Sequence, residues 1–263
     1  MFKLRQYQIL LLLTPLFILL AFYVAGYGHE FSHSTTAWLL GFKQSPLDII
    51  YGGYSWQNLL LLWNVDEKVD YQMLYSQGHL FAIAFIAFAG FFGSAVMYII
   101  TFVLLKKMTS RHKFIYYFIF WLNILNLAEL FSYIPLRVFH NHGDIGNATV
   151  ALNISPWWFL CIVGPLILLA YILFFTQTLP QAYNKLQINS PTSRAILFII
   201  ATYMALGFPA SKVLMQNLSP LPNCLSLISY FIMFFVLYVF WPSRGKSRKN
   251  EEDTNVSSRK DIS

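Results

Sequence analysis

The sequence is short of charge and of cysteine. Only 11% of its 263 residues are charged, whereas 57% are hydrophobic and 18% are aromatic. So few polar side chains cannot cover the surface of a water-soluble globule of this size. The two cysteines, Cys161 and Cys224, lie within or at the start of apolar runs, so no disulfide framework is indicated. These shortages exclude a soluble globular domain and a small disulfide-stapled scaffold.

The sequence also lacks a basic stripe, although its net charge is +7. The basic residues are dispersed between apolar runs and in a short C-terminal stretch, which argues against a nucleic-acid partner. A membrane surface explains them better. We therefore expect an integral membrane protein whose general partner is the lipid bilayer.

Apolar runs recur along the chain at the length of membrane spans, about 20 residues. They predict an all-α, polytopic membrane protein with about six transmembrane helices, at residues 9–28, 79–105, 114–136, 157–178, 194–215 and 225–241. The first run is longer than the apolar part of a cleaved signal peptide, so we expect it to stay as a helix. Residues 1–242 then form one membrane domain, and residues 243–263 a disordered polar tail.

The positions of the basic residues predict an orientation. With six spans, 14 of the 18 Lys and Arg residues fall on the side of both termini and four fall on the other side. Lys and Arg are enriched on the cytoplasmic side of membranes. We therefore expect both termini in the cytoplasm, with the protein in a bacterial inner membrane or an equivalent one.

Three ionisable side chains lie at the end of the first apolar run, within residues 28–33. On a helix, His29 and His33 are one turn apart and face the same way, so their imidazoles can bind one zinc ion. Glu30 lies beside them as general base, in the H-E-x-x-H pattern of zinc peptidases. The alternative is that the two histidines only satisfy backbone carbonyls at a membrane interface. Ionisable residues in a membrane are functional by default, which favours the metal site.

Residues 43–77, which follow this motif, are too charged and too broken to span a membrane. Their aromatic content suits the headgroup level, and Gly52 and Gly53 mark a turn. We expect an interfacial or re-entrant segment packed near the motif. It either anchors the chain at the interface or gates access of a substrate.

The third span carries a polar face, because Asn123, Asn126, Glu129 and Tyr133 recur at intervals of three and four residues. Polar groups at this depth need partners inside the bundle, so we expect this face to look toward His29 and His33. Asn123 and Asn126 either lead water to the site and hold a developing oxyanion, or form hydrogen bonds between helices.

Several sequence features together resemble the site-2-protease family of intramembrane zinc metalloproteases. They are the H-E-x-x-H motif, Asn126-Leu127, Ser132-Tyr133-Ile134-Pro135 and Gly143-Asp144-Ile145-Gly146, about a quarter of the chain. In that family an Asp after a segment containing Asn and Pro supplies the third zinc ligand. The resemblance implies His29, His33 and Asp144 as ligands and Glu30 as the catalytic base.

Glu129 is the alternative third ligand, because soluble zinc peptidases also complete this motif with a Glu from a later helix. It lies about two turns, roughly 11 Å, before Pro135 at the end of its helix, whereas the two histidines lie at the end of theirs. Asp144 follows that same end in a glycine-flanked loop. We therefore expect Asp144 to bind zinc and Glu129 to hold a histidine N–H or a water.

The function that these residues imply is hydrolysis of membrane-protein substrates by water that a Zn²⁺ ion activates. Two non-enzymatic alternatives stay open. A transporter or metal-handling membrane protein also places His and Glu inside a bundle. An inactive protease relative would bind membrane partners without cleaving them.

Overall fold

Helices make up most of the described chain. The computed structural model describes residues 6–109 and 111–242; these residues are 77% helical, and the only strands among them are two of two residues each. The all-α expectation is confirmed. The predicted tail, residues 243–263, lies outside the described residues.

Five helical segments of the described chain are long and apolar enough to cross a membrane, and a bent pair of helices makes a sixth if it counts as one span. The bent pair is α1 (Gln6–Leu12) and α2 (Thr14–Leu39). The other segments are α5 (Leu80–Lys107), α6 with η1 (Lys113–Phe131, Ser132–Leu136), α8 with η2 and α9 (Pro156–Leu173, Phe174–Thr178, Leu179–Lys185), α10 with η3 and α11 (Pro191–Thr202, Tyr203–Gly207, Phe208–Gln216), and α12 (Pro220–Val239).

The first span differs from the single straight helix expected at residues 9–28. Helices α1 and α2 meet at an angle of 60° around Leu13. Pro15, in the first turn of α2, has no N–H to donate, so the helix is easily broken there. The motif helix therefore begins at Thr14, and it continues through His33 to Leu39, as expected.

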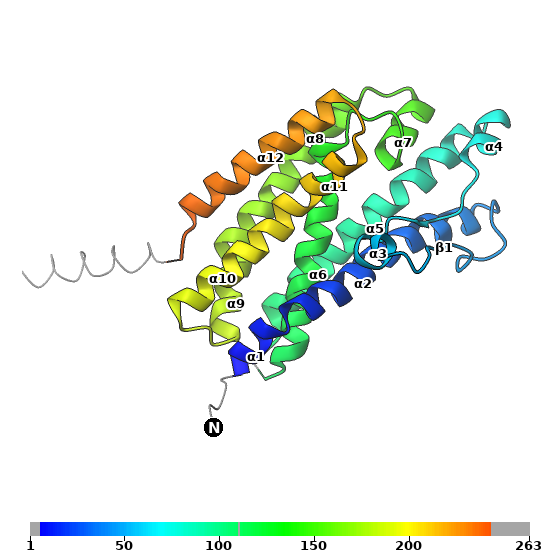
Figure 1. Cartoon of the computed structure of the whole chain (residues 1–263). Coiled ribbons are helices and arrows are strands. Elements are labelled where there is room, and N and C mark those ends of the chain that lie inside the picture. Colours follow the sequence, from blue (N-terminus) through cyan, green and yellow to red (C-terminus); the bar gives the residue numbers. More distant parts are fainter. Residues whose placement is uncertain (1–5, 110, 243–263) are drawn as a thin grey trace, which may run out of the picture.

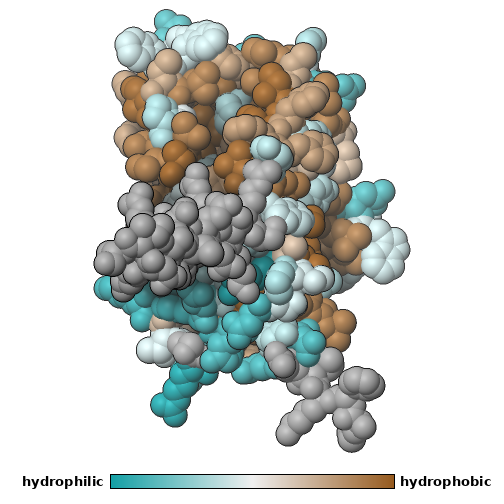
Figure 2. All heavy atoms as spheres, turned by 90° about the vertical axis from the view of Figure 1, so that its left-hand side faces the viewer, coloured by the Kyte–Doolittle hydropathy of each residue, from teal (hydrophilic) through white to brown (hydrophobic). Residues whose placement is uncertain are grey.

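Helix α6 lies between the two halves of the bundle. It packs against α2 and α5 on one side and against η3, α8 and α11 on the other, and it is the most buried of the candidate spans (Figure 1). Its first half fills the core with Tyr116, Tyr117, Phe120 and Trp121. Helices α8 and α12 lie outermost and expose mainly apolar side chains. Figure 2 shows one face of the molecule, on which apolar side chains cover the upper part and hydrophilic ones gather below.

Small residues let α2 and α5 approach closely. A Cβ atom added to Gly93 on α5 would lie 2.1 Å from the Oγ of Ser32 on α2, too close for any real side chain. Close packing over small residues is how helices associate in lipid, where the hydrophobic effect gives no drive for helices to meet. The face of α2 that carries the motif is therefore pressed against α5.

Residues 43–77 fold back beside the motif helix. They contain strands β1 (Ile50–Tyr51) and β2 (Val65–Asp66), which pair as an antiparallel hairpin, and helices α3 (Trp56–Leu61) and α4 (Tyr71–Ser76). The Lys43 amine donates to Ser34 Oγ of α2 at 2.8 Å and to two backbone carbonyls of this segment, those of Asp48 and Glu67. The segment is thus fixed against α2 near the motif, as the sequence predicts.

Candidate metal centre

The two motif histidines lie on the buried face of α2 and point toward α5. His29 is 3% exposed and His33 is 1% exposed. Their Nε2 atoms are 3.2 Å apart, because residues four apart on a helix lie one above the other. Two imidazoles thus present the same nitrogen to the same point.

Hydrogen bonds on the far side of each ring set the direction of these nitrogens. Nδ1 of His33 lies 2.6 Å from the Ile86 carbonyl oxygen, which can only accept, so Nδ1 carries a proton and Nε2 is the nitrogen that can meet Asp144 or a metal. Nδ1 of His29 lies 3.1 Å from Ser94 Oγ. Fixing the outer nitrogen in this way is typical of histidines that bind metals.

Asp144 completes the cluster from α7 (Asp144–Leu152), the short helix that it begins. Its Oδ2 lies 2.9 Å from His29 Nε2 and 3.1 Å from His33 Nε2. Bonds of about 2.0–2.1 Å to a tetrahedral zinc ion would hold ligand atoms roughly 3.3 Å apart. The donor set and its spacing therefore fit a zinc ion after shifts of a few tenths of an ångström, and in the described part of the chain these three residues are the group of His, Cys, Asp and Glu side chains that could hold a metal ion.

Asp144 lies at a helix start rather than inside the polar loop expected from the sequence. Gly143, just before it, has φ +80°, a conformation that favours glycine. Burial alone would raise the pKa of the Asp144 carboxyl, but the His33 and His29 rings hold that pKa well below its usual range. The carboxylate is thus kept charged, which is the form that binds metal.

Gly90 of α5 leaves the space in front of the cluster open. A Cβ at this position would lie 2.1 Å from His33 Nε2 and 2.6 Å from His29 Nε2. The atoms it would strike are the two that face Asp144. The absence of a side chain at Gly90 is therefore required for the three donors to share one space.

Glu30 is partly exposed beside the cluster. Its carboxyl lies within electrostatic range of His29, His33 and Asp144, but it forms no hydrogen bond or ion pair with them. A carboxyl that is close to the donors without binding them is placed to accept a proton from a water there. Glu67, from the segment at residues 43–77, is the next nearest acid.

Tyr133 of η1 brings a hydroxyl to the same point. Its OH lies 3.0 Å from His29 Nε2, and its ring stacks on the His29 ring with centroids 5.3 Å apart and planes at 10°. The Arg137 guanidinium covers the Tyr133 ring at 4.1 Å. The hydroxyl is therefore held between rigid neighbours and aimed into the centre.

The two asparagines of the polar face are used elsewhere. The Asn123 amide donates to the Tyr98 carbonyl at 3.1 Å and to Thr101 Oγ1 at 2.9 Å, both on α5. The Asn126 amide donates to the Leu122 carbonyl at 2.8 Å. The structure thus places the Asn123 amide in helix-to-helix bonding and brings neither amide to the cluster.

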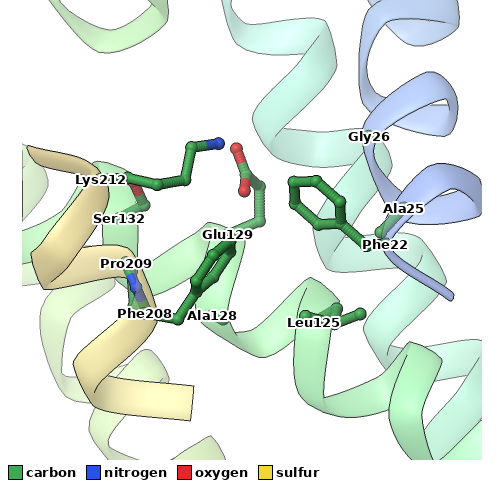
Figure 3. A pocket seen from close by; sticks show the side chains of 10 residues that line it. All are labelled: Phe22, Ala25, Gly26, Leu125, Ala128, Glu129, Ser132, Phe208, Pro209 and Lys212. Carbon is green, nitrogen blue, oxygen red and sulfur yellow. The ribbon is translucent and has the colours of Figure 1, made fainter. Parts of the chain in front are cut away.

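Glu129 lies beside an earlier part of α2 than the cluster does. It lines a cavity of about 10 Å³ between α2, α6 and α11, and Figure 3 shows the Lys212 amine of α11 pointing toward its carboxylate. On α2 this cavity is bounded by Phe22, Ala25 and Gly26, one to two turns before His29. Its size suits about one water molecule. No hydrogen bond joins Glu129 to the histidines in the described residues.

Three supporting groups carry no sequence signal for a role at the cluster. The spacing of Gly90 and Ser94 indicates only a surface for close helix packing, and the Ile86 carbonyl belongs to the backbone. All three come from α5, at positions that turn toward α2. Placing the two helices face to face would have been needed to find them.

Comparison with protein-family models, curated proteins and solved structures found no match to this chain. The interpretation of the centre therefore depends on its own geometry and on the chemistry of its side chains.

We expect the purified protein to hold about one zinc ion per chain, and His29→Ala, His33→Ala and Asp144→Ala each to lose it. Removing one of three protein donors leaves an incomplete site. Glu129→Gln serves as the matched acid control and keeps its zinc. The measurement is metal content by mass spectrometry after gel filtration. Zinc lost from Glu129→Gln and retained in Asp144→Ala would reverse the ligand assignment.

Gly90→Ala should weaken zinc binding by at least about tenfold, the scale seen when groups around metal ligands are disturbed. The added methyl occupies the space that the two Nε2 atoms face. Gly164→Ala is the matched control, since a Cβ there meets only an ordinary contact at 3.6 Å. Competition with a zinc chelator measures both affinities. Equal affinities in the two variants would show that the donors do not share the space beside Gly90.

Proposed function

We propose that this chain is a multi-pass integral membrane zinc metalloprotease that hydrolyses membrane-protein substrates. The observation that carries the proposal is the meeting of His29 Nε2, His33 Nε2 and Asp144 Oδ2 at one point, next to Glu30. The apolar helices supply the membrane setting. A helix that brings H-E-x-x-H to an Asp from a later turn is also what the resemblance to site-2 proteases implies.

The chemistry is divided among few groups. A zinc ion, when bound, lowers the pKa of a water toward ~7 and polarises a carbonyl. Glu30 takes the proton of the attacking water and returns it to the leaving amine. The Tyr133 hydroxyl donates a hydrogen bond to the carbonyl oxygen as that oxygen becomes negative. Ser94 and the Ile86 carbonyl keep the two imidazoles in the required orientation.

Residues 43–77 lie beside the centre. This segment is fixed to α2 by Lys43, and it places Glu67 within electrostatic range of Glu30. We propose that a substrate enters beside this segment as a locally unwound strand and that the segment gates its access.

Glu30→Gln should abolish cleavage of a model transmembrane substrate while zinc content stays near one per chain. The substitution removes the base and no ligand, and general bases typically contribute 10²–10⁴-fold. Cleavage is measured by gel shift after reconstitution into vesicles. The retained zinc content shows that a loss of cleavage does not come from a loss of the fold around the centre.

Unchanged turnover in Glu30→Gln would reject the peptidase mechanism. Zinc binding with no cleavage by the wild-type protein would instead favour a metal-handling protein or an inactive protease relative. These two outcomes separate the proposed enzyme from both alternatives.

Tyr133→Phe should lower kcat by about 10²-fold and leave KM and zinc content nearly unchanged, because the hydroxyl stabilises charge that develops only in the transition state. The ring and its stacking on His29 are retained in this variant. Steady-state kinetics and metal analysis are the readouts. If the variant instead loses zinc, and kcat falls by the same factor as the zinc content, then the hydroxyl helps to hold the metal and does not stabilise the transition state.

A further inference from the structure

A second pocket opens beside the loop that delivers Asp144. Its volume is about 350 Å³, and it is lined by Trp63, Arg137, His140, His142, Gly143, Met215, Gln216 and Leu218. This is within the range of about 300–1,000 Å³ found for ligand sites. None of the lining residues is a metal donor or has a part in the proposed hydrolysis.

The pocket is lined by N–H donors and by no acid. Arg137 supplies one fixed positive charge, His140 and His142 add two imidazoles, and no Asp or Glu lines the pocket. Arg137 is partly buried, its Nε donates to the Ser132 carbonyl at 3.4 Å, and its guanidinium lies over the Tyr133 ring. Glu129 and Asp144 lie within electrostatic range of it, but neither forms an ion pair with it in the described residues. The guanidinium therefore has no carboxylate in direct contact, which leaves N–H donors for a phosphate in the pocket.

The loop that forms the pocket is held in place by its surroundings. The His140 N–H donates to the Arg137 carbonyl at 2.9 Å. A Cβ at Gly146 would lie 2.4 Å from the His140 carbonyl oxygen, so the first turn of α7 packs directly on the loop. Phe139 packs against Trp157 with ring centroids 4.7 Å apart. The basic groups are thus arranged before any ligand arrives.

The position of the pocket indicates the source of the anion. Two candidate spans end there, one at Leu136 and one at Gln216, next to Arg137 and Leu218. At the end of a span, the anions of a bilayer are lipid phosphates. Trp63, Met215 and Leu218 add an apolar side to the pocket. This side can contact the glycerol and acyl region of a lipid, whereas a free ion would make no contact with it.

We propose that this pocket binds the phosphate of an anionic phospholipid headgroup. Arginine binds phosphate through a planar fork of N–H donors, and basic pockets between transmembrane helices are typical sites for such headgroups. The site goes beyond the proposed hydrolysis and does not depend on it. It does depend on insertion into a membrane.

A lipid in this pocket would touch the supports of two zinc donors. Arg137 lies on the Tyr133 ring, which stacks on His29, and Gly143 precedes Asp144 in the chain. The lipid composition of the membrane would therefore act on the centre through contacts that are already in place.

The test uses the full chain in detergent, with native mass spectrometry to count bound lipid and a thermal shift as a second readout. The probes are dioctanoyl phosphatidic acid, dioctanoyl phosphatidylcholine and inorganic phosphate. We expect one phosphatidic acid per chain and a higher melting temperature with it. Phosphatidylcholine and inorganic phosphate should produce neither effect at the same concentration.

Arg137→Lys and the double variant His140→Gln/His142→Gln should each bind phosphatidic acid about tenfold more weakly, the scale of losing a hydrogen bond to a charged group. Arg137→Lys keeps the charge over Tyr133, so the fold is retained. Lys113→Gln is the control, since it removes one basic residue at the opposite end of α6.

Three results would overturn the proposal. Equal binding in both variants would place the lipid elsewhere. Equal stabilisation by inorganic phosphate would make the ligand a free anion, and equal stabilisation by phosphatidylcholine would remove the role of the basic groups. Each is measured without a protease substrate, so the outcome is independent of the proposed hydrolysis.

Discussion

The structure depends on one buried interaction, the contact of the Asp144 carboxylate with the two imidazoles of α2. These groups are separated by more than a hundred residues in the chain, and each is costly to bury alone. Once together they satisfy one another, and their donor atoms leave a space that suits a metal ion. For this contact to form, the chain must pass through α5 and α6 and return along the loop to α7.

Helix α5 provides the surface that orients the two imidazoles. It supplies an accepting carbonyl from Ile86, a hydroxyl from Ser94 and empty space from Gly90. These groups lie on one face of the helix, and the close approach at Gly93 brings that face against α2. Small residues in this span therefore have two functions: they let the helices pack and they leave room for the donors.

The sequence predicts the helices and the three side chains that meet at the cluster, but it does not predict the groups that surround them. Apolar length predicts a span regardless of tertiary contacts, and H-E-x-x-H spacing fixes two donors on one helix face. The start of a helix at Asp144 and the bend before Thr14 depend on local packing and on Pro15. The sequence predicts least well where a polar helix face points. Asn123 and Glu129 share a helical stripe with Tyr133, yet only Tyr133, in η1 just after α6, forms a hydrogen bond with His29.

Lys212 and Glu129 form a second charged site, separate from the three donors. The structure places Lys212 within α11, with its amine pointing toward the Glu129 carboxylate (Figure 3). The cavity that both residues line reaches α2 at Phe22, Ala25 and Gly26, one to two turns before His29. Lys212 thus gives Glu129 a cation of its own within electrostatic range, and this cation favours the charged carboxylate away from the three donors.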